Sequence, residues 1–199
     1  MKVYLDGCSL TYGQGLPRDR SIGQLLVNIG KHQVMDKSRP AKSNQAIIAD
    51  TWNNRNNYDV YFLGFTYSDR YHIKFRNLDI DMHPSKIINI DYQKYNDAII
   101  EDAVSMIHKG SYALYDRMFY SQQSDALVDM IISKLNSLNK IVIPYSWEKR
   151  TIDSEVFYPV YTKEFHISKT DSHLNEKGTM HLFDTLQLML LTELEKNEK

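Results

Sequence analysis

The sequence predicts an α/β fold of three layers, an α/β/α sandwich in which a mainly parallel sheet lies between two layers of helices. Short apolar runs alternate along the chain with segments whose apolar residues repeat at helical spacing, which is the order typical of parallel sheets. A length of 199 residues, of which 42% are hydrophobic, is enough to bury a core on both faces of such a sheet. One domain over residues 1–199 is therefore expected.

The first half of the chain contains three expected strands and two expected helices. The first helix begins at Ser21, because Ser21 and Gln24 form a capping-box pattern ahead of a buried apolar stripe. The second helix is short and begins at Ser43 or Asn44, since either side chain can cap it. The strand expected at residues 58–65 is placed at the centre of the sheet, because it is rich in aromatic and β-branched residues. In chain order these elements are strand 2–6, helix 21–29, strand 32–36, the short helix around 46–48 and strand 58–65.

The second half is less regular, but its apolar patterns predict three helices and one further strand. Residues 71–82 are polar and are expected to form an excursion or an edge hairpin, which is a candidate lid. The stretch 145–170 has no periodicity, as is common for loops at the functional end of a sheet. Asn175 is expected to cap a closing helix with apolar residues at helical spacing. The other expected elements are helices around 99–107 and 127–138, which flank the aromatic segment 112–120, and strand 140–144.

Charge and composition argue against several classes of partner. The 24 basic and 25 acidic residues are well mixed, with a formal net charge of -1, so no surface for nucleic acid or anionic lipid is expected. The single cysteine, Cys8, cannot form an internal disulfide, and the N-terminus does not resemble a signal peptide. The longest apolar run, 186–191, is interrupted by Gln187 and is far shorter than the roughly 20 residues of a membrane span. A soluble, cytoplasmic protein is therefore expected.

The segment after the first expected strand carries the first candidate catalytic residue. It reads DGCSLTYG over residues 6–13, and Ser9 lies just beyond the carboxyl end of the strand, where parallel α/β sheets bind ligands. The glycines in this segment allow a tight turn and the close approach of a substrate. On its own, the segment fits an ordinary strand-to-helix turn better than a catalytic site, because short Gly/Ser motifs are weak evidence.

The second candidate segment reads TDSHLN over residues 170–175, just before the closing helix. A histidine in a loop with a carboxylate nearby can be the base for a nucleophilic serine, because the carboxylate fixes the tautomer and stabilises the imidazolium. His173 and Asp171 form such a pair in the sequence. On its own, this segment also fits a polar turn before an asparagine cap.

Together, the two segments resemble the first and last sequence blocks of the SGNH (GDSL-type) hydrolases. In that family the nucleophile lies in a Gly-Asp-Ser motif directly after the first strand, and the catalytic His and Asp precede the closing helix. Gly7-Cys8-Ser9 matches the first block, except that Cys8 replaces the usual Asp.

The last block matches in its pattern but differs in the spacing of the acid. His173, Asn175 and Gly178 fit the family pattern His-x-Asn-x-x-Gly, whereas the family acid commonly lies three residues before the His, where this chain has Thr170. The resemblance implies a flavodoxin-like central sheet, with Ser9 as nucleophile, His173 as base and Asp171 as the acid that orients it. It implies no cofactor and no metal.

The middle blocks resemble the family less closely. In the family, the oxyanion hole consists of the nucleophile's N–H, a glycine N–H and an asparagine side chain. The loop 40–44 stands in the place of the glycine block, so the resemblance implies Ala41 or Lys42 as the second backbone donor beside Ser9. Gly64-Phe65-Thr66 stands where the family has Gly-x-Asn, so the Thr66 hydroxyl would replace the asparagine amide. Candidate substrate contacts near these blocks are Asn44, Gly64 and Tyr12.

Two alternatives concern the nucleophile and a metal. Cys8 is an alternative nucleophile, but adjacent residues at a strand end point to opposite faces, and the motif position belongs to Ser9. A metal site is suggested by three potential ligands that alternate along one expected strand, and so would share one face of it: Asp79, Asp81 and His83. The solvated face of an edge strand explains the same pattern, and no second cluster of ligands supports a metal site.

Other histidines and tyrosines are reserve candidates. His166 and His72 can serve as base or substrate contact, although each also fits a surface position. The tyrosine-rich stretches can line an apolar or sugar-binding cleft, and helix packing accounts for most of them without a ligand; they include Tyr112, Tyr115 and Tyr120.

The expected function is hydrolysis of an ester by a serine mechanism, on a small-molecule or carbohydrate substrate that carries an O-acyl group. The block pattern also resembles that of bacteriophage-encoded members, so the host cytoplasm is an expected location. The rival interpretation is a catalytically weak or inactive protein that keeps the fold as a binding or structural module; Thr66 and the spacing of Asp171 favour it. No residue pattern specifies the acyl group, the alcohol or the oligomeric state.

Overall fold

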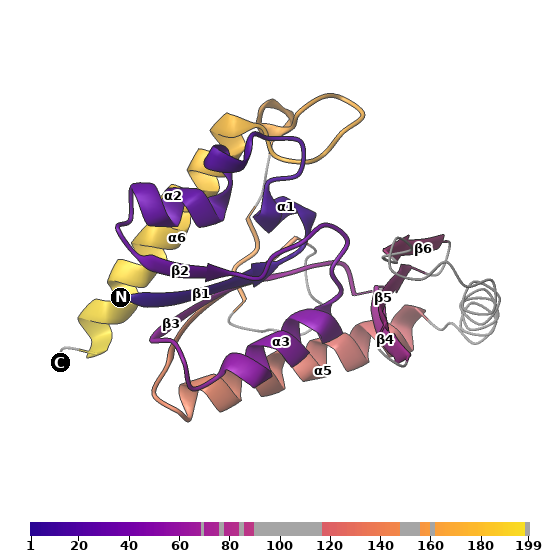
Figure 1. Ribbon diagram of the computed structural model, residues 1–199, viewed down its shortest axis with the longest axis horizontal. Helices are drawn as coiled ribbons and strands as arrows, with labels where there is room; N and C mark the ends of the chain where they lie inside the picture. Colours follow the sequence, from indigo (N-terminus) through magenta and orange to yellow (C-terminus); the bar gives the residue numbers. More distant parts are fainter. Residues whose placement is uncertain are drawn as a thin grey trace.

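The computed structural model contains a four-stranded parallel sheet at its centre (Figure 1). The strand order is β2-β1-β3-β7, and each neighbouring pair is parallel. All four strands were predicted, and the third is central as expected; they are β1 (Lys2–Gly7), β2 (Gln33–Asp36), β3 (Val60–Phe65) and β7 (Ile141–Ser146). The structure describes residues 1–68, 70–75, 78–83, 86–89, 117–147, 156–159 and 162–197.

Helices cover both faces of this sheet (Figure 1). On one face lie α2 (Ile22–Asn28) and α6 (Glu176–Asn197), and on the other lie α3 (Asn44–Asn54) and α5 (Arg117–Asn136). A single helical turn, α1 (Ser9–Tyr12), follows the carboxyl end of β1. The α/β fold, with a parallel sheet flanked by helices, is therefore confirmed.

Alternation along the strands divides the core into two layers, because successive side chains of a strand point to opposite faces. The layer beneath α2 and α6 includes Val3, Leu5, Val60, Phe62, Ile143, Leu26, Leu182 and Leu186. The layer beneath α3 and α5 includes Tyr4, Tyr61, Leu63, Phe65, Ile47, Val128, Ile131 and Leu135. Asp6 shares the face of Tyr4, so its carboxylate is directed toward α3.

Three side-chain caps fix where the helices begin. Ser21 caps α2 as expected, because its Oγ accepts a hydrogen bond from the Gln24 N–H at 3.4 Å. Ser43, rather than Asn44, caps α3. The Asn175 side chain accepts a backbone N–H of the first turn of α6, which confirms the expected cap of the closing helix.

The helix α5 begins earlier than its apolar pattern predicts. The repeat indicated a start near residue 127, whereas the helix begins at Arg117. Just ahead of residue 127 the helix buries the polar residues Ser124 and Asp125, which interrupt the apolar repeat. The helix expected around 99–107 lies outside the described residues.

The hairpin expected within residues 71–82 is present, but it belongs to a second sheet. Strands β4 (Tyr71–Phe75), β5 (Leu78–His83) and β6 (Lys86–Asn89) form an antiparallel sheet in the order β4-β5-β6. This sheet is separate from the parallel one, so the hairpin is not its edge. The alternating residues Asp79, Asp81 and His83 lie on β5, and their side chains lie outside the described part of the chain.

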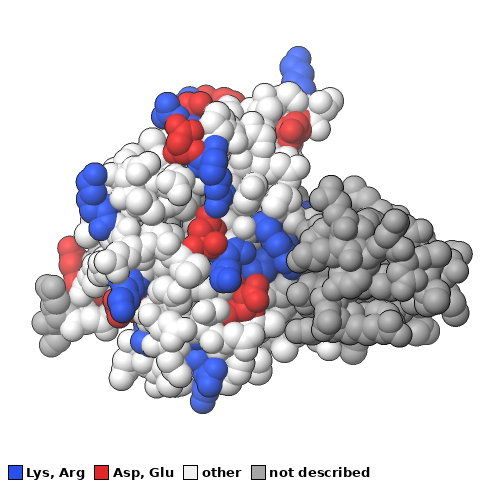
Figure 2. Space-filling model, in the orientation of Figure 1, with Lys and Arg blue, Asp and Glu red and all other residues white. Residues whose placement is uncertain are grey.

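Basic and acidic side chains are interspersed on the face of the described residues drawn in Figure 2. No helix among the described residues is long and apolar enough to cross a membrane.

Candidate active site

Ser9 begins the short helix α1, directly after the strand β1. Cys8 occupies the N-cap position, and Ser9 is the first helical residue. The backbone N–H groups of a first helical turn have no acceptor within the helix, so the Ser9 N–H is available to another group. Cys8 is 1% exposed and packs into the core layer beneath α2 and α6, and Ser9 is 6% exposed, so both side chains are buried. Cys8 thus has an apolar packing role of its own.

A buried hydrogen bond holds the Ser9 turn against the sheet. Thr11 Oγ1 and Tyr145 OH are 2.9 Å apart, and this contact joins α1 to β7. Gly7 of β1 and Gly64 of β3 are paired in the parallel sheet beside this contact. A Cβ atom at Gly64 would lie 2.7 Å from the Tyr145 hydroxyl. Gly64 is thus required for the close packing of Thr11 and Tyr145, whatever it contributes to a substrate.

Asp171 binds His173 through two hydrogen bonds to one oxygen. Its Oδ1 accepts the backbone N–H at 3.0 Å and lies 2.6 Å from Nδ1 of the ring. With Nδ1–H donated to a carboxylate, the neutral imidazole keeps its lone pair on Nε2, as a general base requires. These hydrogen bonds, chiefly the one from the backbone, lower the pKa of Asp171, so its carboxylate stays ionised. Thr170, at the position of the usual family acid, bonds to Ser168 instead.

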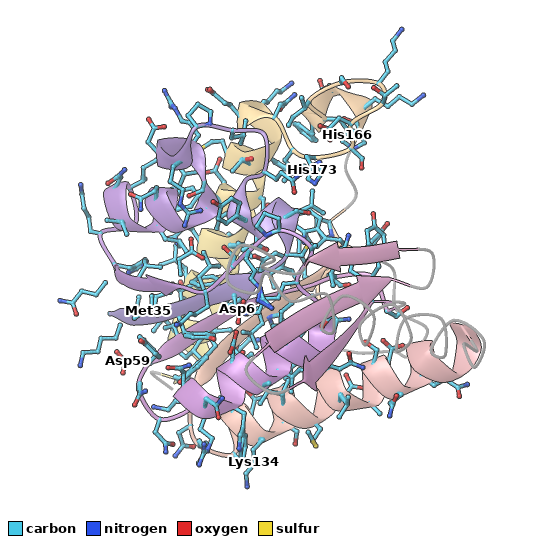
Figure 3. All side chains as sticks on the ribbon, turned by 45° about the vertical axis from the view of Figure 1, so that its right-hand side comes forward. Asp6, Met35, Asp59, Lys134, His166 and His173 are labelled. Carbon is cyan, nitrogen blue, oxygen red and sulfur yellow. The ribbon has the colours of Figure 1, made fainter. Side chains whose placement is uncertain are left out.

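The loop that carries His173 packs against the segment that follows Ser9. Leu174 and Cys8 belong to one hydrophobic cluster. A side chain at Gly15 would collide with Ile167, which shows how closely the two segments approach. Figure 1 shows this loop and α1 on the same side of the molecule, and Figure 3 shows His173 in the loop ahead of α6. The first and last segments identified in the sequence therefore lie near each other.

Ser9 and His173 share no hydrogen bond in the part of the chain that the structure describes. The His173 side chain is 27% exposed and Ser9 is 6% exposed, so the histidine lies nearer to solvent than the serine. Catalytic hydrogen bonds are often long in ligand-free structures and tighten when substrate binds, so this separation does not exclude the pair as candidates. The hydrogen bond to Asp171 fixes the ring of His173 without Ser9.

The loop before α3 offers Ala41 rather than Lys42 as a backbone donor. Ala41 has a φ of 64°, a left-handed conformation that glycine adopts at lower cost. The Lys42 N–H points to the carbonyl of Arg39 at 3.5 Å, within its own turn. The Ala41 N–H has no acceptor among the described residues. Ala41 thus adopts a conformation that favours glycine, and its N–H is the better candidate of the two for an oxyanion.

Asn44 holds the backbone of Thr66, the other oxyanion candidate. Asn44 Nδ2 donates to the Thr66 carbonyl at 3.0 Å and to Ser124 Oγ at 2.9 Å, and its Oδ1 accepts the Thr66 N–H at 2.7 Å. Both amide hydrogens of Asn44 are therefore used, and none is left for a substrate. The Thr66 hydroxyl is buried and has no partner among the described residues, so it is the free donor at this position.

The Lys42 side chain lies in a buried ion pair beneath these groups. Its Nζ is 2.6 Å from Asp6 Oδ1, 2.7 Å from Asp6 Oδ2 and 2.6 Å from Asp50 Oδ2. The side chains of Lys42 and Asp6 are 1% and 0% exposed. Burial raises the pKa of Asp6 to about 7, against the opposing effect of Lys42. Tyr4 donates its hydroxyl to Asp6 Oδ2 at 3.0 Å, and burial raises the pKa of Tyr4, so it stays a neutral donor.

Two other candidates have partners of their own. Tyr12 lies beneath the guanidinium of Arg18, which is 4.5 Å from the ring centroid and also donates to the Tyr12 carbonyl at 3.1 Å. His166 forms a backbone bridge with Leu174, and Figure 3 shows it in the same loop as His173. The side chain of His72 lies outside the described residues. Within the described residues, no group of three His, Cys, Asp or Glu side chains could hold a metal ion.

Sequence reasoning missed the ion pair of Lys42 and the structural role of Asn44. One signal for the first was present: Asp6 ends an apolar strand, and a carboxylate buried in a central strand needs a cation or donors nearby. Asn44 carried no such signal, because its partners Thr66 and Ser124 lie far from it in the sequence.

Comparison with known proteins supports the fold. No family model and no curated protein matches the sequence. The chain is similar in structure to the psychrotrophic esterase EstA from Pseudoalteromonas sp., with a TM-score of 0.55, 9% sequence identity and 98% coverage of both chains. This match confirms the fold that the resemblance to the SGNH (GDSL-type) hydrolases implies; at this identity it speaks for the fold alone.

Two further solved structures align less closely. A protein from Desulfitobacterium hafniense DCB-2, described as lipolytic and of the G-D-S-L family, has a TM-score of 0.43 at 12% identity and covers 94% of this chain and 97% of its own. A member of the lipolytic G-D-S-L family from Veillonella parvula DSM 2008 has a TM-score of 0.39 at 14% identity, with 96% and 98% coverage. Both scores are below 0.5, so the fold assignment rests on the esterase EstA.

Proposed function

We propose that this protein hydrolyses a small ester, with Ser9 as nucleophile, His173 as general base and Asp171 as the acid that orients the base. The observation that carries the proposal is the hydrogen bond of 2.6 Å between Asp171 and His173 Nδ1, in a loop packed against the segment that follows Ser9. The fold similarity to an esterase supports the same chemistry.

The proposed reaction has two steps that use the same groups. Ser9 Oγ attacks the ester carbonyl while its proton moves to His173 Nε2, and His173 then gives that proton to the departing alcohol. Water, activated by His173, releases the acyl group from Ser9 in the second step. The negative oxygen that develops in each step is bound by the N–H of Ser9, the N–H of Ala41 and the hydroxyl of Thr66. Asp171 stabilises the imidazolium throughout.

The proposed substrates are O-acyl groups on a carbohydrate or another small metabolite. Of the charged side chains placed at the site above, Asp171 is held by His173, and Lys42 and Asp6 are buried. None of these three is available to bind a charged substrate, which favours a neutral acylated alcohol.

A phosphonate probe tests the proposal directly. The matched esterase is inhibited by monoethylphosphonate, and phosphonates of this kind modify nucleophilic serines. An activated alkylphosphonate should add once per chain, peptide mass spectrometry should map the adduct to Ser9, and hydrolysis of an aryl acetate should stop in parallel. Cys8→Ala is the matched control, since it should still be labelled and active, whereas Ser9→Ala should be neither. An adduct on Cys8, or equal turnover by wild type and Ser9→Ala, would overturn the assignment.

A binding protein that keeps the fold without turnover is the second candidate. Two observations favour it: Thr66 stands where the family has an asparagine, and Ser9 and His173 share no hydrogen bond among the described residues. The two candidates differ in one measurement, because a binding protein would give the same background rate on aryl acetates as Ser9→Ala.

A further inference from the structure

The ammonium group of Lys42 joins three parts of the chain beside the proposed site. It contacts Asp6 at the end of β1, the carbonyl of Lys37 at 3.2 Å, and Asp50 in α3. Asp6 is three residues before Ser9, and Lys42 directly follows Ala41. One buried cation therefore links the strand that leads to the nucleophile with the loop that presents the second backbone donor. Figure 3 shows Asp6 in the interior of the molecule, at the sheet.

The loop between β2 and α3 is attached to β1 before it reaches Ala41. The Lys37 N–H donates to the Leu5 carbonyl at 2.8 Å, and the Arg39 N–H donates to the Gly7 carbonyl at 3.1 Å. Beyond Arg39 the chain turns, and Ala41 adopts its left-handed conformation. A non-glycine residue keeps such a conformation only when its surroundings enforce it. The side chain of Lys42 is the next attachment along the chain.

We propose that Lys42 is a positioning residue, whose buried ion pair with Asp6 sets the place of the Ala41 N–H relative to the Ser9 turn and so shapes the oxyanion hole. This inference rests on the proposed function. Asp50 and the carbonyl of Lys37 complete the surroundings of the ammonium and fix its direction.

A contribution to stability does not explain why the chain buries this ion pair. Taking two charges out of water costs free energy that their attraction often fails to recover, and apolar replacements of buried pairs are frequently neutral or stabilising. A specific geometry is the better-attested use of such a pair. Burial raises the pKa of Asp6 to about 7, so the carboxylate is fully ionised only above neutral pH, and activity is best compared near pH 8.

The first experiment compares Lys42→Met with a core variant. Met keeps the length of the aliphatic chain and removes the charge, whereas Leu135→Ala opens a cavity at a fully buried position of α5, away from the loop. For aryl acetate hydrolysis, Lys42→Met should lower kcat about tenfold or more and change KM by less than about threefold, because the misplaced donor acts mainly in the transition state. Leu135→Ala should lose stability and keep kcat.

A second readout does not depend on turnover. Amide hydrogen exchange, followed by NMR at Arg39, whose N–H donates to the Gly7 carbonyl, should become about tenfold faster in Lys42→Met and stay unchanged in Leu135→Ala, since only the first releases the loop. If Lys42→Met does not fold, Asp6→Asn provides the same test, because it breaks the ion pair and leaves Lys42 bonded to Asp50. Where both variants fold, their effects on kcat should be non-additive in the double variant, as expected for two members of one interaction.

The outcomes separate this inference from the proposed function. If wild type and Ser9→Ala turn over aryl acetates equally, the proposed function fails, and exchange at the Arg39 amide still tests whether Lys42 holds the loop. If wild type is active while neither kcat nor Arg39 exchange responds to Lys42→Met or Asp6→Asn, the positioning role is wrong and the function stands. An equal loss of kcat in Leu135→Ala would also overturn the role, since stability alone would then explain the effect.

Discussion

Asn44 fixes Thr66 by both backbone groups of that residue and leaves the threonine hydroxyl without a partner among the described residues. The amide donates to the Thr66 carbonyl at 3.0 Å and accepts the Thr66 N–H at 2.7 Å. A buried hydroxyl without a hydrogen bond lowers the free energy of unfolding, so its presence in a native protein calls for an explanation. In the proposed site, this hydroxyl donates to the oxyanion.

Thr66→Val is therefore expected to raise stability and lower activity together. Valine has nearly the same shape, so removing an unsatisfied hydroxyl should raise the free energy of unfolding by about 1 kcal/mol. The loss of one oxyanion donor should lower kcat by roughly 10²-fold. Urea denaturation and steady-state hydrolysis of one aryl ester measure the two effects.

Thr66→Ser is the matched control, because it keeps the hydroxyl and removes only a methyl group. It should keep kcat and gain no stability. If Thr66→Val retains full kcat, Thr66 is no part of the oxyanion hole.

Asp171→Asn tests the orientation of His173. An asparagine at this position presents an amide to Nδ1 and favours the wrong tautomer, which can cost about 10⁴-fold in kcat in a serine triad. Asp171 is 43% exposed, so the thermal unfolding temperature should change little. Thr170→Ala removes the neighbouring side chain at the usual family position of the acid and should leave kcat unchanged. If kcat falls further in Thr170→Ala than in Asp171→Asn, Asp171 is not the acid that orients His173.

Local patterns in the sequence predicted the parallel sheet and the helix caps, because both depend on residues close together in the chain. Alternating apolar residues set the strands, and Ser21 and Asn175 each bond to an N–H three residues ahead. The pairing of Asp171 with His173 was equally local. These features need no knowledge of the tertiary structure.

Features that depend on distant residues escaped sequence reasoning. Ser43 and Asn44 were equal candidates for the cap of α3; the structure assigns the cap to Ser43 and uses Asn44 to reach Thr66 and Ser124. Lys42 was considered only for its backbone N–H, although its ammonium group binds a carboxylate 36 positions away. These polar groups are buried against partners that only the tertiary fold brings close. The spacing of apolar residues along the chain gives no information about such partners.

Ala41→Gly tests whether the left-handed backbone at Ala41 is strained. A non-glycine residue loses about 1–2 kcal/mol in this conformation, and glycine loses roughly 0.5–1 kcal/mol through its freedom in the unfolded chain, so a net gain of up to about 1.5 kcal/mol is expected. The N–H remains, so kcat should be unchanged. Lys31→Gly, at an exposed residue with a φ of 54°, should gain a similar amount by urea denaturation. A loss of stability in Ala41→Gly alone would mean that the methyl group makes contacts worth more than the strain.

The carboxyl group of Asp6 should make the stability of the protein depend on pH near neutrality. Burial raises its pKa from 3.8 to about 7, and the groups that face it are Tyr4 on β1, Lys42 in the loop before α3, and Asp50 in α3. Between these two pKa values the folded protein holds a proton at Asp6 that the unfolded chain has released. The stabilising effect of that proton is fully present below about pH 4 and is lost as the pH rises to about 7.

Comparison of wild type with Asp6→Asn isolates this effect. The difference in the free energy of unfolding should move in favour of Asp6→Asn as the pH rises from about 4 to 7, by at most about 1.4 kcal/mol per pH unit, and should level off above pH 7. Urea denaturation of both proteins at half-unit steps between pH 4 and 8 measures it, and titrating groups that do not interact with Asp6 cancel in the difference. Asp59→Asn, at a carboxylate near the amino end of β1, controls for the general effect of removing a negative charge. A flat difference for Asp6→Asn would mean that Lys42 keeps Asp6 ionised in the folded protein over the whole range.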